Sequence, residues 1–402
     1  MNVLYFGEFC DNSLYKKKEN KHLPYFVAQY MYEKALCDEI AKDVEVNLEI
    51  ISIYLTEYFP KDTFLFNRKS RGETKLGYLN FINIPYLREI SYFLSACIKI
   101  LSWYVRNRDT RNMRIYASCH FAPVSLAIVL MGKILSIKRI CTFTDLAIFS
   151  FSKDRISKMK FYKRILIKPY VDMVTYLQKS YDAYVLFSEG MNQLVNPKNK
   201  PNVIVEGIFN GENLNCKTSN IKMNAIAHAG TLNAEYGIDR ILDLFELIDD
   251  PSLELWLFGN GDMADEINNR AKVDTRIKYF GFIPREDVFE KLKQAKLLIN
   301  LRCSNDIYTK YSFPSKMFEY MVSTTPVFTT RLQGIPHSYY QFLYVTDDEN
   351  LNIIKSQILE ILQKDQSELN EFGKCAAKYI LDKKNSTYQI MQINKLLKSV
   401  NN

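Results

Sequence analysis

The chain has 402 residues, of which 47% are hydrophobic and 24% charged. This length allows two or three domains of about 150 residues each, and the composition excludes extended disorder. Only 14 residues are glycine, about half of the usual share of roughly 7%, which argues against a propeller or a large β-barrel. The net charge of +8 is unevenly divided, because residues 1–210 carry 30 Lys and Arg against 20 Asp and Glu, and residues 211–402 carry 23 against 25. Two domains with different partners are therefore expected, and the basic one would suit anionic lipid or nucleic acid.

Cysteine and histidine usage favours a reducing, cytoplasmic compartment without a metal site. The eight cysteines form no Cys-x-x-Cys pair, and the four histidines are dispersed. The apolar N-terminus meets Glu8 without a basic leader, so no signal peptide is predicted. The most apolar run, Phe121–Met131, is shorter than the roughly 20 residues that span a membrane.

Short apolar runs alternate with helical patterns in the first half of the chain. Helices are predicted over Val27–Ala41 and Leu87–Val105, and residues 56–85 show little periodicity and are predicted to form a long loop. The predicted strands are Val3–Phe6, Val46–Leu55, Arg114–Cys119, Arg139–Phe143, Tyr184–Phe187 and Val203–Val205. This order is typical of a parallel sheet with crossover helices.

The second half repeats this order more regularly. An apolar stripe with a 3.6-residue period over Ile238–Ile248 predicts a helix, and further helices are expected over Met263–Ala271, Arg285–Gln294 and Pro314–Ser323. The predicted strands are Asn224–His228, Leu253–Phe258, Ile277–Phe280, Lys296–Leu301, Pro326–Thr329 and Leu343–Thr346.

The predicted fold class is therefore α/β, with two Rossmann-like domains and parallel sheets that face each other across a cleft. The domains are expected at residues 1–210 and 211–385, with a C-terminal helix over 386–402 that returns to the first domain. Ligands bind at the carboxyl ends of the strands in such sheets, so the functional residues are sought there.

The most specific segment is residues 311–321, YSFPSKMFEYM, followed by Thr325-Pro326-Val327. Pro314 suits the first turn of a helix that Ser312 or Ser315 could cap, and the exposed amides would form an anion site. Lys316 and Glu319 are three residues apart and share a helix face, which would place a cation for phosphate beside a carboxylate for ribose hydroxyls. A capped surface helix with an ion pair explains the same residues.

This segment resembles the nucleotide-sugar site of glycosyltransferase family 4, which has the GT-B fold, and in particular its bacterial capsular and exopolysaccharide members. Asn300-Leu301-Arg302 before the motif and Gly334-Ile335-Pro336 after it extend the resemblance over most of residues 224–348. The resemblance implies that Glu319 binds ribose. It also implies that a run of backbone groups faces the phosphate and the sugar, those of Ser312, Phe313, Pro314 and Ser315.

The chain departs from the family pattern at three positions. The first glutamate of the family's pair is Tyr311 here, and the customary Arg and Lys for the leaving diphosphate are Thr231 and Tyr236. Developing phosphate charge needs compensation, so another cation must replace them. The candidates are Arg302, Lys310 and Lys316, with Arg240 farther along its helix.

Several strand-end loops carry further candidates. Gly230 and Thr231, Gly259 and Gly261, and Phe282 are expected at the donor, although tight turns and core packing also explain them. In the first half, Gly7 ends a strand, and the resemblance implies that it lies beside donor phosphate or acceptor. Asp145 follows another strand and is expected to contact the acceptor or act as a base, with a helix N-cap as the alternative.

Residues 151–170 hold seven Lys or Arg and one acid among aromatic and aliphatic residues. This pattern favours an anionic membrane surface, with a solvated helix as the alternative; no motif supports nucleic acid. The resemblance thus implies a retaining, metal-independent glycosyltransferase without a cofactor, on the inner face of the plasma membrane. It would move a sugar from a UDP-sugar or related donor to a lipid-linked saccharide during capsule or exopolysaccharide synthesis. A non-catalytic partner subunit and a sugar-nucleotide 2-epimerase are the alternatives.

Overall fold

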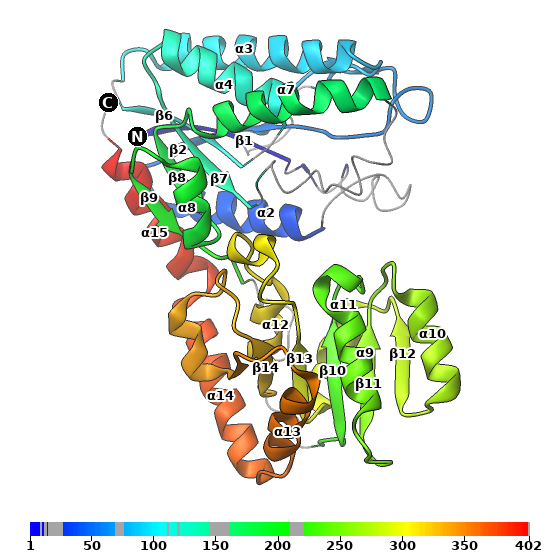
Figure 1. The fold of residues 1–402 in the computed structure, drawn as a ribbon. Coiled ribbons are helices and arrows are strands. Elements are labelled where there is room, and N and C mark those ends of the chain that lie inside the picture. The colour runs from blue at the N-terminus through cyan, green and yellow to red at the C-terminus, as the bar shows by residue number, and fades with distance from the viewer. Residues whose placement is uncertain are drawn as a thin grey trace. The chain divides into compact units, whose positions relative to one another are not determined.

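The computed structural model describes residues 1–8, 10, 11, 14, 27–68, 76–110, 112–118, 121–144, 146, 161–209 and 221–400, without the side chains of 27, 28, 31 and 161–166. The chain divides into two compact units (Figure 1). Unit 1 comprises Met1–Ile208 and Ser386–Asn402, and unit 2 comprises Phe209–Asn385.

Unit 1 contains a seven-stranded sheet in the order β4-β2-β1-β6-β7-β8-β9, and each neighbouring pair is parallel. Its central strands are buried apolar runs, as expected for a parallel sheet covered on both faces. The strands are β1 (Asn2–Gly7), β2 (Asn47–Ser52), β4 (Leu76–Tyr78), β6 (Met113–Ala117), β7 (Lys138–Phe143), β8 (Ala183–Leu186) and β9 (Asn202–Ile204).

The helices of unit 1 follow the strands and cover the sheet. They are α2 (Val27–Lys42), α3 (Leu87–Asn107), α4 (Ala122–Ile134), α7 (Phe161–Gln178), α8 (Glu189–Val195) and α15 (Ser386–Ser399). Although α15 lies at the end of the chain, its Ile390, Ile393 and Leu397 pack in one core cluster with Val3 and Tyr5 of β1. No helix in the described part of the chain is both long and apolar enough to cross a membrane.

The expected long loop over residues 56–85 is wrong in part. It contains β4 and a small antiparallel sheet of β3 (Leu65–Phe66) and β5 (Phe81–Ile82). These strands are only two or three residues long, so they show no period in the sequence. Aromatic stacking holds the segment, because Phe66 stacks on both Tyr54 and Phe81.

Unit 2 contains a six-stranded parallel sheet in the order β12-β11-β10-β13-β14-β15. Alternate residues along the strands pack into two separate core clusters; Ala227 belongs to one cluster and Ile226 to the other. The strands are β10 (Ala225–Ala229), β11 (Glu254–Phe258), β12 (Ile277–Gly281), β13 (Leu297–Asn300), β14 (Val327–Thr330) and β15 (Tyr344–Thr346). The α-helices are α9 (Ile238–Glu246), α10 (Ala264–Val273), α11 (Arg285–Gln294), α12 (Lys316–Val322), α13 (Leu351–Leu362) and α14 (Gln366–Lys383). Three short 3₁₀ segments are η1 (Ala234–Tyr236), η2 (Ile307–Lys310) and η3 (His337–Phe342).

Both sheets confirm the prediction of two doubly wound α/β sheets, and their strand orders locate the ligand-binding edge. In unit 2 the strand order reverses between β10 and β13, and in unit 1 between β1 and β6. Ligands of open α/β sheets bind beyond the carboxyl ends of the strands at such a reversal. The residues that follow β10 and β13 are therefore the first place to look for a site.

Candidate functional site

The carboxyl ends of β10 and β13 bring together residues that lie about 70 positions apart in the sequence. Gly230 and Thr231 follow β10, and Arg302 follows β13 two residues after its end. A Cβ atom at Gly230 would lie 3.7 Å from Cγ of Lys316 and 3.8 Å from Nε2 of His228. Gly230, His228 and Lys316 thus form one group at the strand reversal, and Thr231 is exposed there.

Tyr320 fixes α12 against this edge. Its buried hydroxyl accepts a hydrogen bond from the backbone N–H of Ala229 at 2.7 Å and donates one to the Ala229 carbonyl at 2.9 Å. The last residue of β10 is therefore tied to the middle of α12, and Lys316 and Glu319 are carried by the same helix. Tyr320 lies within residues 311–321, but nothing in that sequence indicated that its hydroxyl would bind the end of β10.

Glu319 is an ionised carboxylate that two cations hold in place. Its Oε1 accepts a hydrogen bond from Nε of Arg285 at 2.8 Å, and its Oε2 accepts one from Nζ of Lys316 at 2.9 Å. Burial raises the pKa of Glu319, but the charges and hydrogen bonds of Lys316 and Arg285 outweigh burial and lower the pKa overall. Lys316 and Glu319 thus share a helix face as expected, and they form the ion pair of the alternative explanation. Their contacts with phosphate and ribose stay predictions. Arg285 was not predicted, because it comes from the start of α11.

The expected helix start at Pro314 is wrong. The helix α12 begins at Lys316, and its N-cap residue Ser315 makes no side-chain capping hydrogen bond because it has helical φ and ψ angles of −55° and −29°. Phe313 and Pro314 are buried, and the Phe313 ring packs against Phe318 and Tyr339. The proline segment is therefore held by core packing, and Ser315 is exposed.

Arg302 lies over an aromatic ring instead of beside a carboxylate. Its guanidinium carbon is 4.6 Å from the ring centroid of Tyr236, and its Nε is buried without a hydrogen-bond partner. Burial lowers the pKa of Arg302. Tyr308, whose hydroxyl donates to the carbonyl of Glu235, meets the edge of Tyr236. The resemblance implies a lysine at this position, and in this chain the Tyr236 ring lies against an arginine from the neighbouring strand end.

Gly237 permits this arrangement. It has a φ of +79°, and a Cβ atom on it would lie 2.2 Å from the Leu301 carbonyl oxygen. Only glycine tolerates both this backbone conformation and this contact. The segment that carries Tyr236 can therefore lie directly against the backbone beneath Arg302.

His228 is buried at the same edge of the sheet. Its Nδ1 lies 2.9 Å from the Ile299 carbonyl oxygen and must donate to it, so Nε2 carries the lone pair. Burial, together with the smaller effect of the charges of Arg302 and Lys316, lowers the pKa of His228 to about 4. The imidazole is therefore neutral at pH 7. Nothing in the sequence indicates this role for His228.

The glycine-rich loops are packed tightly on one another. Gly259 has a φ of +125°, and a Cβ atom there would lie only 1.9 Å from the Gly230 carbonyl oxygen. A Cβ atom at Gly261 would lie 2.2 Å from the Leu232 carbonyl oxygen. Close backbone packing thus accounts for both glycines, and their contact with a donor stays a prediction. Phe282, beyond the end of β12, is 89% exposed.

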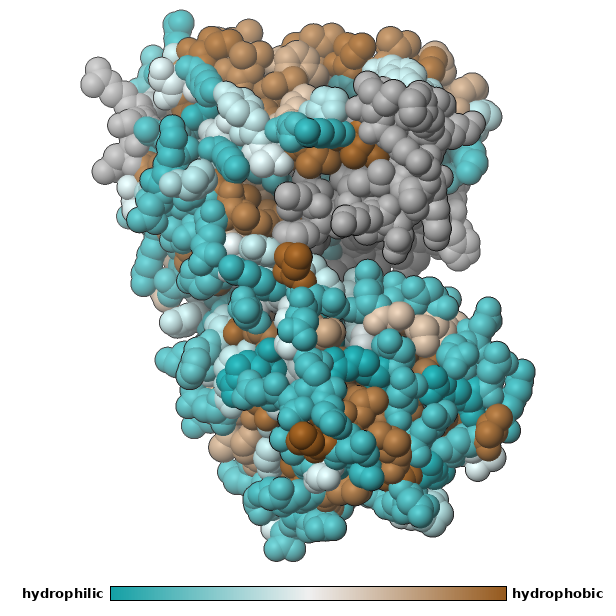
Figure 2. Space-filling view, in the orientation of Figure 1, coloured by the Kyte–Doolittle hydropathy of each residue, from teal (hydrophilic) through white to brown (hydrophobic). Residues whose placement is uncertain are grey.

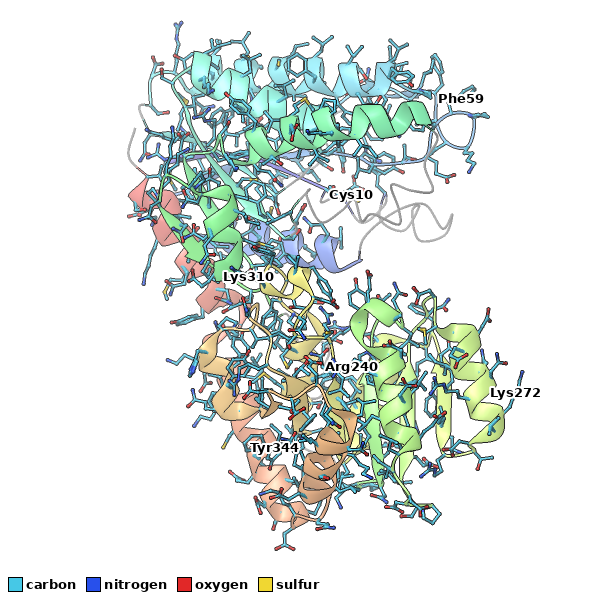
Figure 3. The ribbon with its side chains drawn as sticks, viewed as in Figure 1. Cys10, Phe59, Arg240, Lys272, Lys310 and Tyr344 are labelled. Carbon is cyan, nitrogen blue, oxygen red and sulfur yellow. The ribbon has the colours of Figure 1, made fainter. Side chains whose placement is uncertain are left out.

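The other expected cations are engaged elsewhere. Arg240, labelled in Figure 3, forms an ion pair with Glu349. Lys310, also labelled, lies 5.6 Å from the Tyr311 ring centroid. A Cβ atom at Gly334 would lie 2.2 Å from the Ser312 carbonyl oxygen, so Ser312 is held by this loop.

In unit 1, Gly7 lies at the strand reversal, where a Cβ atom would be 2.4 Å from Oε2 of the buried Glu33. Asp145 and residues 151–160 lie outside the described residues. Among the described residues, no group of three or more His, Cys, Asp or Glu could hold a metal ion.

Comparisons with known proteins agree with this fold. Residues 224–364 match the model of the family described as Glycosyl transferases group 1. Solved structures match over nearly the whole chain. Sucrose-phosphate synthase from Thermosynechococcus elongatus is 12% identical with a TM-score of 0.64, and the alignment covers 99% of this chain and 98% of that one. The chain has the GT-B fold.

Two further GT-B structures are similar. HepE from Anabaena, solved with UDP, is 12% identical with a TM-score of 0.64, and all of both chains is covered. The lipopolysaccharide outer core galactosyltransferase WaaB in its apo form is 11% identical with a TM-score of 0.63, with 99% of each chain covered. No curated protein matches this chain in sequence. The predicted GT-B fold is thus confirmed, and the family match together with the fold supports a glycosyltransferase.

Proposed function

We propose that this protein is a retaining glycosyltransferase that takes a sugar from a nucleoside diphosphate, with UDP as the nucleotide. The observation that carries the proposal is the pair of cations at the strand reversal of unit 2. Arg302 has no carboxylate partner among the described residues, and Lys316 lies beside Gly230. A partly buried guanidinium whose Nε lacks a hydrogen-bond partner is costly for the protein alone, and a bound anion would compensate its charge.

Glu319 is assigned to the ribose of the donor. Each carboxylate oxygen can accept a second hydrogen bond in addition to those from Arg285 and Lys316. Two neighbouring ribose hydroxyls would supply these donors. The lowered pKa of Glu319 keeps it an acceptor at neutral pH. Phe282 offers an exposed ring for the base.

Arg302 and Lys316 are assigned to the diphosphate. When the bond between the anomeric carbon and the phosphate oxygen breaks, negative charge grows on the leaving group. Cations that are already in place stabilise that charge without reorganisation. The acceptor hydroxyl oxygen then bonds to the anomeric carbon on the same face, and its proton passes to the departing phosphate oxygen. This route needs positioning and charge stabilisation more than a protein nucleophile.

The acceptor is proposed to be a lipid-linked saccharide in capsule or exopolysaccharide synthesis, on the inner face of the plasma membrane. Its support is the resemblance of residues 311–321 and the basic character of residues 1–210. Gly7 at the strand reversal of unit 1, Asp145 and the basic residues 151–170 stay predictions for contacts with donor, acceptor and membrane, respectively. UDP is supported by HepE, whose structures contain UDP or UDP-glucose.

The test is a thermal-shift screen of the purified chain against UDP-, GDP- and other nucleotide sugars. A ligand that binds only the folded state at about 100 times its Kd stabilises it by about 2.7 kcal/mol. We expect UDP-sugars to raise the Tm and GDP-sugars to leave it unchanged. A chain that no nucleotide sugar stabilises would contradict the proposal.

A non-catalytic partner subunit is the second candidate, because Thr231, Tyr236 and Tyr311 replace the customary residues. Release of UDP from the stabilising donor, measured with and without an acceptor, separates the two functions. Turnover supports the enzyme, whereas tight binding without any turnover in the presence of an authentic acceptor supports the subunit.

A further inference from the structure

Among the described residues of unit 1, the helices α3, α4 and α7 together carry many exposed apolar side chains. Figure 2 shows hydrophobic residues gathered along the edge of unit 1 where Figure 1 places α3 and α4. We name this surface the α3 face. Its exposed apolar members are Leu87, Ile90, Leu94, Ile98, Leu101 and Val105 on α3, Leu126, Leu130 and Ile134 on α4, and Tyr170, Met173 and Tyr176 on α7.

The helix α3 is apolar on two opposite sides. Tyr92, Ala96, Ile100 and Trp103 are buried within unit 1. The exposed residues at 87, 90, 94, 98, 101 and 105 recur every three or four positions, so they form a second stripe along nearly the whole helix. Ile98 is 66% exposed. A helix that is hydrophobic all round is normally buried on every side.

The neighbouring elements extend this stripe into a broad surface. The helix α3 packs against α4, and α4 packs against α7. Beyond the start of α3 lie Tyr86, which is 83% exposed, and Phe59 and Phe64, whose rings meet edge to face. Phe59 is labelled in Figure 3 at this end of the surface. Monomeric soluble proteins rarely expose apolar patches of more than a few hundred Å².

The charges on these helices distinguish between two occupants. The helices α3, α4 and α7 contain seven Lys or Arg and two acids. Lys99, Lys133 and Lys168 form no ion pair with a described carboxylate, and the ammonium of Lys133 lies 5.8 Å from the Tyr176 ring centroid. A second copy of the chain would bring the same positive charge to the interface. An anionic bilayer offers hydrocarbon to the aliphatic residues and negative charge to the lysines, while tyrosine rings suit the boundary between them.

We propose that the α3 face binds the surface of a bilayer that contains anionic phospholipid, with α3 lying in the plane of the headgroups. This deepens the proposed function, since it rests on the lipid-linked acceptor for its biological purpose. It overlaps the predicted contact through residues 151–170 only in α7, which carries Lys168 and Tyr170, and most of the surface is made of side chains on α3 and α4. Lipid binding is measured without donor or acceptor, so its failure is distinguishable from failure of the transferase proposal.

The experiment is flotation of the full-length chain with vesicles of equal parts phosphatidylcholine and phosphatidylglycerol. The double variant Leu94→Glu with Ile98→Glu places two charges in the centre of the stripe, and we expect it to weaken binding about tenfold or more. The matched control is Val44→Glu, because Val44 is fully exposed in the turn before β2, away from this surface. Circular dichroism and the Tm should be unchanged in both variants, since the substituted side chains are exposed.

A second variant set separates charge from apolar burial. Replacing Lys99, Lys133 and Lys168 by Gln should lower affinity for the anionic vesicles about fivefold per lysine and leave affinity for pure phosphatidylcholine unchanged. Equal flotation of the native chain and the Glu double variant would overturn the proposal. A chain that does not float, but forms a dimer that the double variant dissociates in analytical ultracentrifugation, would overturn it and assign the face to a second copy.

Discussion

The strand reversal of unit 2 and the α3 face of unit 1 depart from ordinary folding rules in opposite ways. At the reversal, Arg302 buries a guanidinium nitrogen without a hydrogen-bond partner. On the α3 face, aliphatic side chains such as Ile98 are left in contact with water. The first costs desolvation energy and the second forgoes hydrophobic stabilisation. Local departures of this kind are expected at functional sites, so the two regions point to two different ligands, an anion and a hydrocarbon surface.

The two regions also differ in how they are held. At the reversal, the Tyr320 hydroxyl and the close contact at Gly237 lock the backbone around the charged groups. On the α3 face, the exposed stripe is held only through the buried side of its helix, which includes Trp103. Substitutions at the reversal should therefore change chemistry and the response to pH, whereas substitutions on the exposed stripe should change association and leave stability unaltered.

The largest effect is expected from Arg302→Ala. Loss of a preorganised donor to developing negative charge typically lowers kcat by about 100- to 1,000-fold. The Tm should change little, because Arg302 has no ion pair with a described carboxylate to lose and its cation–π contact with Tyr236 is offset by the relief of a partly buried charge. Steady-state kinetics with a UDP-sugar, together with a thermal melt, measure both quantities.

The matched control is Arg240→Ala. Arg240 forms an ion pair with Glu349, so its loss should lower the Tm and leave kcat within a few-fold of the native value. Equal loss of activity in the two variants would show that Arg302 does not replace the missing cations. The strand reversal of unit 2 would then have no demonstrated catalytic role.

A smaller effect is expected when the buried His228 imidazole is protonated, and it is an effect on the free energy of unfolding. The folded-state pKa of His228 is lowered to about 4, whereas an unfolded chain has the ordinary value of about 6.5. Between these values the unfolded chain binds more protons, so the free energy of unfolding must fall as the pH falls from about 6.5 to 4. The loss reaches about 3 kcal/mol at the lower limit.

Urea unfolding at several pH values tests this contribution. His228→Asn keeps a donor for the Ile299 carbonyl but cannot titrate, so the variant should lose this part of the pH dependence. His337→Asn is the control, because His337 is exposed. Parallel pH profiles of native chain and His228→Asn would show that the imidazole is not held neutral by its surroundings.

The sequence predicted the fold well because both sheets are built from continuous apolar runs and regular helices. The stripe over Ile238–Ile248 appears as the buried side of α9, and the spacing of Lys316 and Glu319 appears as an ion pair of 2.9 Å. Short elements were missed, since β3, with two residues, carries no period.

The site was predicted only where its residues are neighbours in the sequence. Arg285 reaches Glu319 across 34 residues, and Tyr320 reaches Ala229 across 91. No local pattern indicates such pairs. The sequence named Arg302 as a cation and Tyr236 as a departure from the family, but that the two contact each other follows only from the adjacent strand ends.

The smallest effect is expected from substitution of Tyr236, whose ring lies against the Arg302 guanidinium. A cation–π contact of this kind contributes about 1 kcal/mol, so Tyr236→Leu should lower kcat about fivefold by loosening the guanidinium. Tyr236→Phe keeps the aromatic face 4.6 Å from the guanidinium carbon and should keep most of the activity. Because Tyr236 acts through Arg302, adding Tyr236→Leu to Arg302→Ala should cost nothing further, and this double-mutant cycle separates positioning from a direct contact with the donor. Equal losses in the Phe and Leu variants, or additive losses in the double variant, would instead assign Tyr236 to the ligand itself.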